Sequence, residues 1–360
     1  MNYIRQIDGL RFVAIFLVLA FHFAPCLDSY ESVGYFGVDL FFVISGFLIT
    51  GILLRTKDSF AGDYKNFLGR RALRIFPLYY ATLVVLFITG NSVVRDYFAY
   101  FISYTYNYAY EIHRSAIPDN HSNMVHFWSL AVEEQFYLSW PCIVLLLRNN
   151  LTLLSRIALF IIVVCLAQYY FSLVPWWVKF KYVGIIPRAY SLLLGSLGAL
   201  SLKQNKLPVA LLRSKYTGYT AMIILLGILM VDHLRLTFVL SPLFALFMVL
   251  KATNETFLPT FINRFLSHKA IVHLGLISYG IYVFHLPIAY YGDLYLFGAA
   301  GDKRTVPSGF FHSPGVHTQL MKFFLYSVLS IGAAHLSYKF FESPVLTLKD
   351  RFFRYRNSKP

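Results

Sequence analysis

Charged residues are scarce in this chain of 360 residues. Asp, Glu, Lys and Arg make up 14% of it, whereas a soluble globular domain carries about 25%. Hydrophobic residues make up 58% of the chain and aromatic residues 18%. This shortage of charge excludes an ordinary soluble domain and predicts an integral membrane protein, in which aromatic side chains suit the two membrane–water interfaces.

Cysteines, repeats and processing signals are also lacking. The three cysteines are too few for a disulfide framework. No small-residue cleavage site follows the first apolar stretch, so we expect no cleavable signal peptide. Without internal repeats or a low-complexity linker, the simplest organisation is one membrane domain over residues 1–342 and a basic cytoplasmic tail over 343–360.

Apolar segments near the length of a membrane span recur along the whole chain. A transmembrane helix needs about 20 predominantly apolar residues. The predicted fold is therefore all-α, with about ten transmembrane helices, at residues 8–24, 36–54, 73–90, 127–147, 157–173, 187–202, 217–231, 236–250, 272–291 and 319–338.

Basic residues are distributed unevenly between the two sides of these spans. Of 32 Lys and Arg residues, 22 fall in the alternate connections that include both termini, and 8 fall in the other set. The positive-inside rule then places both termini in the cytoplasm. The formal charge of +15 follows mostly from this topology and needs no nucleic-acid partner.

The first span carries polar residues that membrane helices normally exclude. Asp8, Arg11 and His22 share one helical face, and Arg11 and His22 lie roughly 16 Å apart along the axis. An ionisable group at membrane depth costs roughly 2.5–3.5 kcal/mol and indicates a functional site. The alternative is that Asp8 and Arg11 anchor one interface and His22 lies at the other.

The second span adds a carboxylate at the level of His22. Asp39 lies a few residues into this span from the outer side, where it is predicted to orient the His22 imidazole through a hydrogen bond. Ser45 is a further candidate for the same site. Gly46 beside it is predicted to allow close helix packing.

Three arginines cluster at the predicted cytoplasmic end of the third span. Arg71 and Arg74 are one helical turn apart, with Arg70 beside them. Two guanidinium groups at this spacing suit bidentate binding of phosphate. The alternative is a topology anchor without a ligand.

The fourth span contains a second polar stripe. His126, Glu133 and Tyr137 fall on one face, and the adjacent Glu134 points about 100° away. One carboxylate is predicted to pair with a basic group and the other to act as acid or base, although an ion pair that fixes helix packing would give the same pattern. His285, inside the ninth span, is a further candidate with packing as its alternative role.

In chain order, these motifs resemble the membrane-bound acyltransferase 3 family, which includes bacterial polysaccharide and lipopolysaccharide O-acetyltransferases. The resemblance extends from about Asp8 to Glu342, and the motifs that carry it are IDGLR with the later His, GYFGVDLFFVISGFLIT, RRALRIFP, HFWSLAVEEQFYL, SYGIYVFH and FFESP. It implies about ten spans in the bacterial inner membrane and acetyl-CoA or another acyl-CoA as donor. It also implies a sugar hydroxyl at the outer face as acceptor, on a surface polysaccharide, a lipopolysaccharide or a lipid-linked sugar.

The resemblance also assigns individual residues. The family's paired Arg and His fall on Arg11 and His22, its R-x-x-R pair on Arg71 and Arg74, and its acidic pair on Glu133 and Glu134. Some members carry a further extracellular hydrolase-like domain, and this chain resembles the stand-alone type. No metal is expected.

These features together suggest one mechanism. The donor phosphates would bind Arg71, Arg74 and Arg70, and the thioester would reach His22 along the polar face of the first span. His22 would act either as base or as acyl relay, helped by Asp39 or Glu133. The alternative function is a transporter of a lipid-linked glycan that uses these groups as a proton relay, although the inverted repeats typical of many transporters are not detected.

Acceptor binding is predicted in the long outward loops, 91–126 and 292–318. The first is rich in side chains that can stack on and hydrogen-bond to sugar rings: Tyr106, Tyr108, Tyr110, Asn120 and His121. Interfacial tyrosines without a ligand would give the same composition.

Overall fold

The regular secondary structure of the described residues is entirely helical. The computed structural model describes residues 3–24, 31–117, 124–174, 180, 182–214, 216–220, 223, 227, 234–296 and 316–353. Within these ranges every regular element is helical and no strand occurs. The predicted all-α fold is confirmed.

Membrane-length helices account for most of the predicted spans. Seven helices in the described residues are long and apolar enough to cross a membrane. They are α1 (Arg5–Phe23), α2 (Glu31–Leu53), α3 (Phe60–Ile88), α7 (Phe127–Leu147), α8 (Leu151–Phe171), α9 (Ile185–Lys203) and the continuous stretch Gln319–Phe352.

Two further apolar regions depart from a simple span. α14 (Lys269–Leu276) and α15 (Ser278–Tyr295) qualify only together, and they are bent by 65° at the break between them. The apolar part of α12 (Leu234–Ala252) is shorter than the others. Each predicted span coincides with one of these helices except 217–231, most of which lies outside the described residues.

The third span begins earlier than predicted. α3 starts at Phe60, where the Ser59 side chain caps it by accepting a hydrogen bond from the Gly62 backbone N–H at 3.1 Å. Such a cap satisfies a backbone donor that has no partner within the helix. The Arg70–Arg74 cluster therefore lies inside a 29-residue helix, and not at its end.

Internal packing divides the chain into two compact units. The first comprises residues 1–55, 143–165 and 189–278, and the second comprises 56–142, 166–188 and 279–360. Each unit combines segments that are far apart in the sequence.

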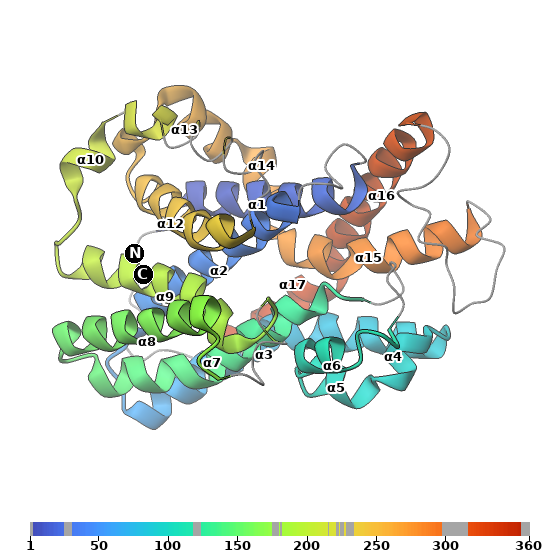
Figure 1. The fold of residues 1–360 in the computed structure, drawn as a ribbon, viewed down its shortest axis with the longest axis horizontal. Helices are drawn as coiled ribbons and strands as arrows, with labels where there is room; N and C mark the ends of the chain where they lie inside the picture. The colour runs from blue at the N-terminus through green and yellow to red at the C-terminus, as the bar shows by residue number, and fades with distance from the viewer. Residues whose placement is uncertain are drawn as a thin grey trace. The chain divides into compact units, whose positions relative to one another are not determined.

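In the first unit, α1 packs against α2 and α14, and α12 packs against α2 (Figure 1). Glycines bring the backbones into contact. A Cβ atom at Gly46 would lie 1.8 Å from the carbonyl oxygen of Leu192, and one at Gly275 would lie 1.8 Å from that of Asp8. The predicted packing role of Gly46 is confirmed, since no larger side chain fits there without movement.

In the second unit, three short helices follow α3 and pack at its end (Figure 1). They lie within the predicted outer loop 91–126, and their aromatic rings stack on one another, as between Phe101 and Tyr106 with ring centroids 3.8 Å apart. Asn120, His121 and residues 297–315 lie outside the described residues. The three helices are α4 (Ser92–Asp96), α5 (Phe98–Ile102) and α6 (Tyr106–Ile112).

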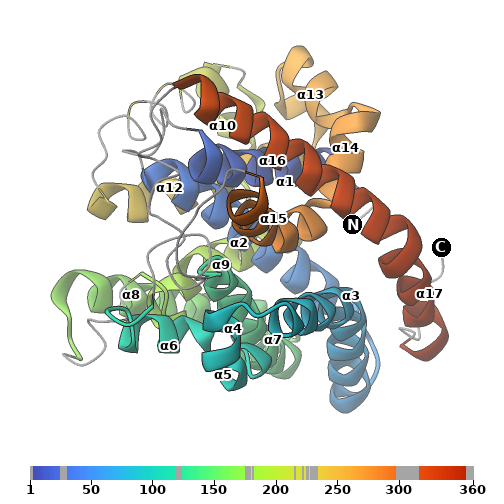
Figure 2. The ribbon, with the colours of Figure 1, turned by 90° about the vertical axis from the view of Figure 1, so that its right-hand side faces the viewer.

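The C-terminal part of the second unit is one long helical stretch. α16 (Val316–Ser337) continues through η5 (Tyr338–Glu342), a π-helix, into α17 (Ser343–Phe352) (Figure 2). α17 packs against α3, and a Cβ atom at Gly69 would lie 2.2 Å from the Phe353 ring. The described part of the predicted tail is therefore a packed element.

Three shorter elements are also described: α10 (Val209–Arg213), η4 (Glu255–Phe257) and α13 (Thr260–Ser267), which packs on α1.

Candidate functional site

The polar face of α1 holds an ion pair. Arg11 Nη1 lies 3.4 Å from Asp8 Oδ1, and both side chains are mostly buried. Burial and a hydrogen bond to Asp8 raise the pKa of Tyr3, just before the helix, to about 12. His22 lies in the last turn of α1, edge-on to Phe21 with ring centroids 5.0 Å apart.

Asp39 is held by two serines of the same unit. Its side chain is 1% exposed, and Ser191 Oγ and Ser241 Oγ each donate to one carboxylate oxygen at 2.8 Å. The carboxylate thereby joins α2 to α9 and α12. The proposed orientation of His22 by Asp39 stays a prediction, and so does a site role for the buried Ser45.

Neither serine was singled out from the sequence. The available indication was a small hydroxyl side chain inside an apolar span, a pattern that many membrane helices share.

Arg71 lies among aromatic rings of the second unit. Its Cζ is 5.3 Å from the centroid of Tyr137 and 5.8 Å from that of Phe67, distances typical of cation–π contacts. The Glu134 carboxyl interacts electrostatically with two charged side chains, Arg71 and Glu133. Among the described residues, Glu134 Oε1 has no hydrogen-bond partner. Arg71 is therefore near the acidic pair, in surroundings unlike those of a solvent-exposed anchor.

The neighbouring arginines have different surroundings. Arg70 Nη1 donates to Asp350 Oδ1 and to the Phe353 carbonyl oxygen, each at 2.9 Å, and so holds the C-terminal helix. Arg74 interacts electrostatically with the Glu342 carboxylate. Glu342 Oε1 also accepts a hydrogen bond from Ser337 Oγ. The sequence grouped three arginines that the structure distinguishes.

His126 and His285 lie together in the second unit. Their ring centroids are 4.8 Å apart at an interplanar angle of 74°, and the residues are 2% and 0% exposed. His285 Nδ1 lies 2.6 Å from the Tyr282 carbonyl oxygen. Because a carbonyl only accepts, Nδ1 carries the proton and Nε2 the lone pair in the neutral ring.

Hydroxyl groups fix the position of this imidazole pair. Tyr282 OH donates to the His126 carbonyl oxygen at 2.7 Å and lies 2.6 Å from Ser129 Oγ. The start of α7 is thereby joined to α15. Tyr282 was missed from the sequence, although its position one turn before His285 was a usable indication.

A buried ion pair was also missed. Lys322 Nζ lies 3.0 Å from Asp293 Oδ1, and Tyr326 OH donates to the same oxygen at 2.7 Å. The indication was a lysine inside an apolar span, which membrane helices rarely carry without a partner.

Metal ligation finds no support in the described ranges, where no group of three or more His, Cys, Asp or Glu side chains could hold an ion.

Comparison with known proteins gives one consistent result. The chain matches the family Acyl_transf_3, described as an acyltransferase domain, over residues 4–339. Peptidoglycan O-acetyltransferase OatA of Listeria monocytogenes is 30% identical over 311 residues, covering 80% of this chain and 49% of that protein. The putative peptidoglycan O-acetyltransferase YrhL of Bacillus subtilis is 28% identical over 392 residues, covering 99% and 57%.

The chain thus spans about half the length of the curated relatives it matches. No solved structure matches it. With helices of membrane length and a family match across nearly all of its residues, the chain belongs to the Acyl_transf_3 acyltransferase family.

Proposed function

We propose that this protein is an integral membrane O-acetyltransferase of the bacterial inner membrane. It moves an acyl group from cytoplasmic acetyl-CoA, or another acyl-CoA, to a hydroxyl of a cell-surface or lipid-linked carbohydrate on the outer side. The observation that carries the proposal is the family match over residues 4–339. The relatives named as peptidoglycan O-acetyltransferases support a carbohydrate acceptor.

Arg71 and Arg74 are proposed to bind the donor phosphates. Each guanidinium offers paired donors, and charge-assisted hydrogen bonds contribute about 1.5–3 kcal/mol each. Arg70 was grouped with them, but its contacts with Asp350 and Phe353 support a role in holding the C-terminal helix. We therefore assign donor binding chiefly to Arg71 and Arg74.

His22 is proposed as the reacting imidazole, in one of two ways. As a base, it removes the proton of the acceptor hydroxyl while the new C–O bond forms and the thioester C–S bond breaks, and the imidazolium then gives that proton to the CoA thiolate. As a relay, its nitrogen attacks the thioester carbonyl and the C–S bond breaks, with CoA leaving as the thiol after taking the ring proton. The acceptor hydroxyl then attacks the acyl-imidazole, the N–C bond breaks, and the ring takes the hydroxyl proton. Asp39, which lies in the same unit, would orient the ring in either case.

The test is release of CoA thiol by purified protein in lipid nanodiscs supplied with acetyl-CoA. Release that depends on a sugar acceptor, with the acyl group recovered on the sugar, supports the proposal. Movement of a lipid-linked glycan across the bilayer without CoA release would support a transporter and contradict it.

A further inference from the structure

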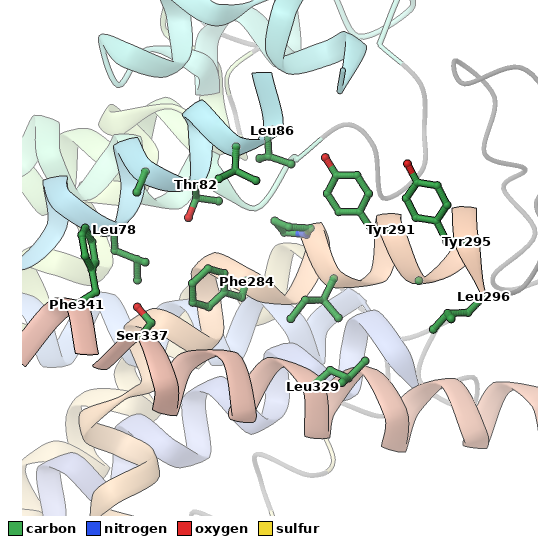
Figure 3. Close-up of a pocket in the computed structure, with 15 residues that line it drawn as sticks. Leu78, Thr82, Leu86, Phe284, Tyr291, Tyr295, Leu296, Leu329, Ser337 and Phe341 are labelled. Atoms are coloured by element: carbon green, nitrogen blue, oxygen red, sulfur yellow. The ribbon is translucent and has the colours of Figure 1, made fainter. Parts of the chain in front are cut away.

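An apolar pocket of about 660 Å³ lies within the second unit, between α3, α15 and α16 (Figure 3). Its volume falls in the range of small-molecule binding sites. None of the residues that line it is among those assigned above to catalysis or donor binding. The lining includes Leu78, Thr82, Val85 and Leu86 of α3, Phe284, Tyr291 and Tyr295 of α15, Leu329 of α16 and Phe341 of η5.

The pocket is about as deep as one leaflet of a bilayer. At 1.5 Å per residue, Leu78 and Leu86 lie about 12 Å apart, and Phe284 and Tyr295 about 17 Å apart, along their helices. The hydrocarbon core of a bilayer is about 30 Å thick. Because α3 and α15 both run outward in the predicted topology, the pocket would occupy the outer leaflet.

The lining is open to lipid. Val85, Leu329 and Phe341 contribute to the pocket and remain exposed on helices of membrane length. Apolar side chains exposed at that depth face hydrocarbon. A chain dissolved in the bilayer can therefore enter the pocket from the side without crossing water.

One polar group inside the pocket lacks a partner. Thr82 points from α3 toward α15 (Figure 3), is 6% exposed, and its hydroxyl has no hydrogen bond within the described structure. A buried hydroxyl without a partner is unfavourable. The pocket is thus a recess with a polar group left unsatisfied, which distinguishes it from a uniformly apolar groove between helices.

The outer end of the pocket adjoins the aromatic loop. The hydroxyls of Thr89 and Tyr291 are hydrogen-bonded there. One residue away from Leu86, the Phe87 ring packs on Phe98 of α5 with centroids 4.9 Å apart, and Arg95 Nε donates to the Phe87 carbonyl oxygen at 2.7 Å. A molecule with its chain in the pocket would present its head to this loop.

We propose that the pocket holds the hydrocarbon anchor of a lipid-linked carbohydrate, with the sugar bound at the aromatic residues of 97–110. We infer this occupant because the apolar pocket, which is open to lipid, adjoins the loop that is proposed to bind the acceptor sugar. The inference rests on the proposed function and narrows its acceptor to a sugar that carries a lipid chain.

The first test measures binding without catalysis. Protein in nanodiscs of phosphatidylethanolamine and phosphatidylglycerol is photolabelled with a dodecyl glucoside that carries a diazirine on its chain. Labelling should map to α3 and α15. The variant Val85→Trp, which fills the pocket, should reduce it roughly tenfold, and Val84→Trp, a neighbouring exposed valine outside the lining, should not.

Two results of this test would overturn the proposal. One is equal labelling of α3 and α15 by a diazirine phosphatidylglycerol, which would indicate a site for bulk lipid. The other is labelling that Val84→Trp and Val85→Trp reduce equally, which would indicate the general lipid-facing surface.

The second test uses methyl and dodecyl N-acetylglucosaminides as acceptors. In the wild type, the dodecyl acceptor should have a lower KM than the methyl acceptor. The ratio of the two KM values should fall roughly tenfold in Val85→Trp and should be unchanged in Val84→Trp. An advantage unaffected by Val85→Trp would contradict the proposal. Absence of CoA release with either acceptor would refute the proposed function instead, and the photolabelling result would still decide where the chain binds.

Discussion

The two units of this protein satisfy their buried polar groups in different ways. In the first, both oxygens of Asp39 accept short hydrogen bonds from serines, and glycines such as Gly46 bring helix backbones into contact. In the second, Arg71 lies over aromatic rings and Glu134 retains an oxygen without a hydrogen bond in the described structure. The Asp39 carboxylate is thus saturated by its own helices, whereas the Glu134 oxygen remains able to accept a hydrogen bond.

This difference suggests a division of roles. His22 lies on α1 of the tightly packed unit, and a reacting group performs best when the elements that carry it are rigid. The arginines, the acidic pair and the apolar pocket lie in the second unit, where recognition groups need to accommodate incoming ligands. Each prediction below tests one side of that division.

The largest effect is expected at His22. His22→Ala should reduce acyl transfer by about 10²- to 10⁴-fold, the usual contribution of a general base or acid, with no loss of folded protein. CoA release by variant and wild type, normalised to monodisperse protein, measures it. Turnover near that of the wild type would remove His22 from the reaction.

A comparable effect, on stability, is expected at Gly46. Gly46→Ala places a methyl group 1.8 Å from the Leu192 carbonyl oxygen, so it should destabilise the protein by about 3 kcal/mol. Gly332→Ala in α16, where a Cβ atom meets nothing within 4 Å, is the matched control. Thermal unfolding in detergent compares the two, and equal melting temperatures would show that the first unit is not tightly packed.

The next largest effect is expected on the affinity for the acyl-CoA donor. Replacing Arg71 and Arg74 together by Gln should raise the acyl-CoA KM at least about tenfold, through loss of charge-assisted contacts. The acceptor KM should change less. If the arginines only set topology, cysteine accessibility would reveal inverted loops while the donor KM stayed the same.

A smaller effect is expected from the hydroxyl that fixes the imidazole pair. Tyr282→Phe removes the donor to the His126 carbonyl oxygen and should lower stability by about 1 kcal/mol. If the pair contributes to the site, kcat should fall as well, with KM values little changed. A loss of stability with full kcat would limit His126 and His285 to packing.

The smallest effect is expected at Arg70. Its ion pair with Asp350 is partly exposed, so Arg70→Gln should cost no more than about 1 kcal/mol. The donor KM should remain within about twofold of the wild type, a difference of less than 1 kcal/mol. A rise like that of the Arg71 and Arg74 variant would return Arg70 to the donor site.

The helices could be predicted because an apolar segment of membrane length has few alternatives to a helix. The break between α14 and α15 could not, since the obvious helix breaker, Pro287, lies inside α15 and the 65° bend falls at Ile277. The early start of α3 was missed because residues 60–72 are polar enough to resemble a loop.

Candidate polar residues could be found one by one, but their partners could not. The contacts of Asp39 with Ser191 and Ser241, and of His126 with His285, join segments far apart in the chain. Spacing within one helix shows which residues share a face, and it contains no information on which other helix that face meets. For the same reason, the sequence grouped Arg70 with Arg71 and Arg74, although its partners are Asp350 and Phe353.

The π-helix η5 has a consequence for how this family can vary in length. A π-turn accommodates an additional residue within a helix, so α17 keeps nearly the rotation that regular winding with one residue fewer would give it, whereas an extra residue in an unbroken α-helix would turn it by about 100°. That rotation would separate Asp350 from Arg70 and the Phe353 ring from Gly69. Loss of one residue should therefore be tolerated within these five residues, and it should displace α17 when it falls in the regular turns of α16.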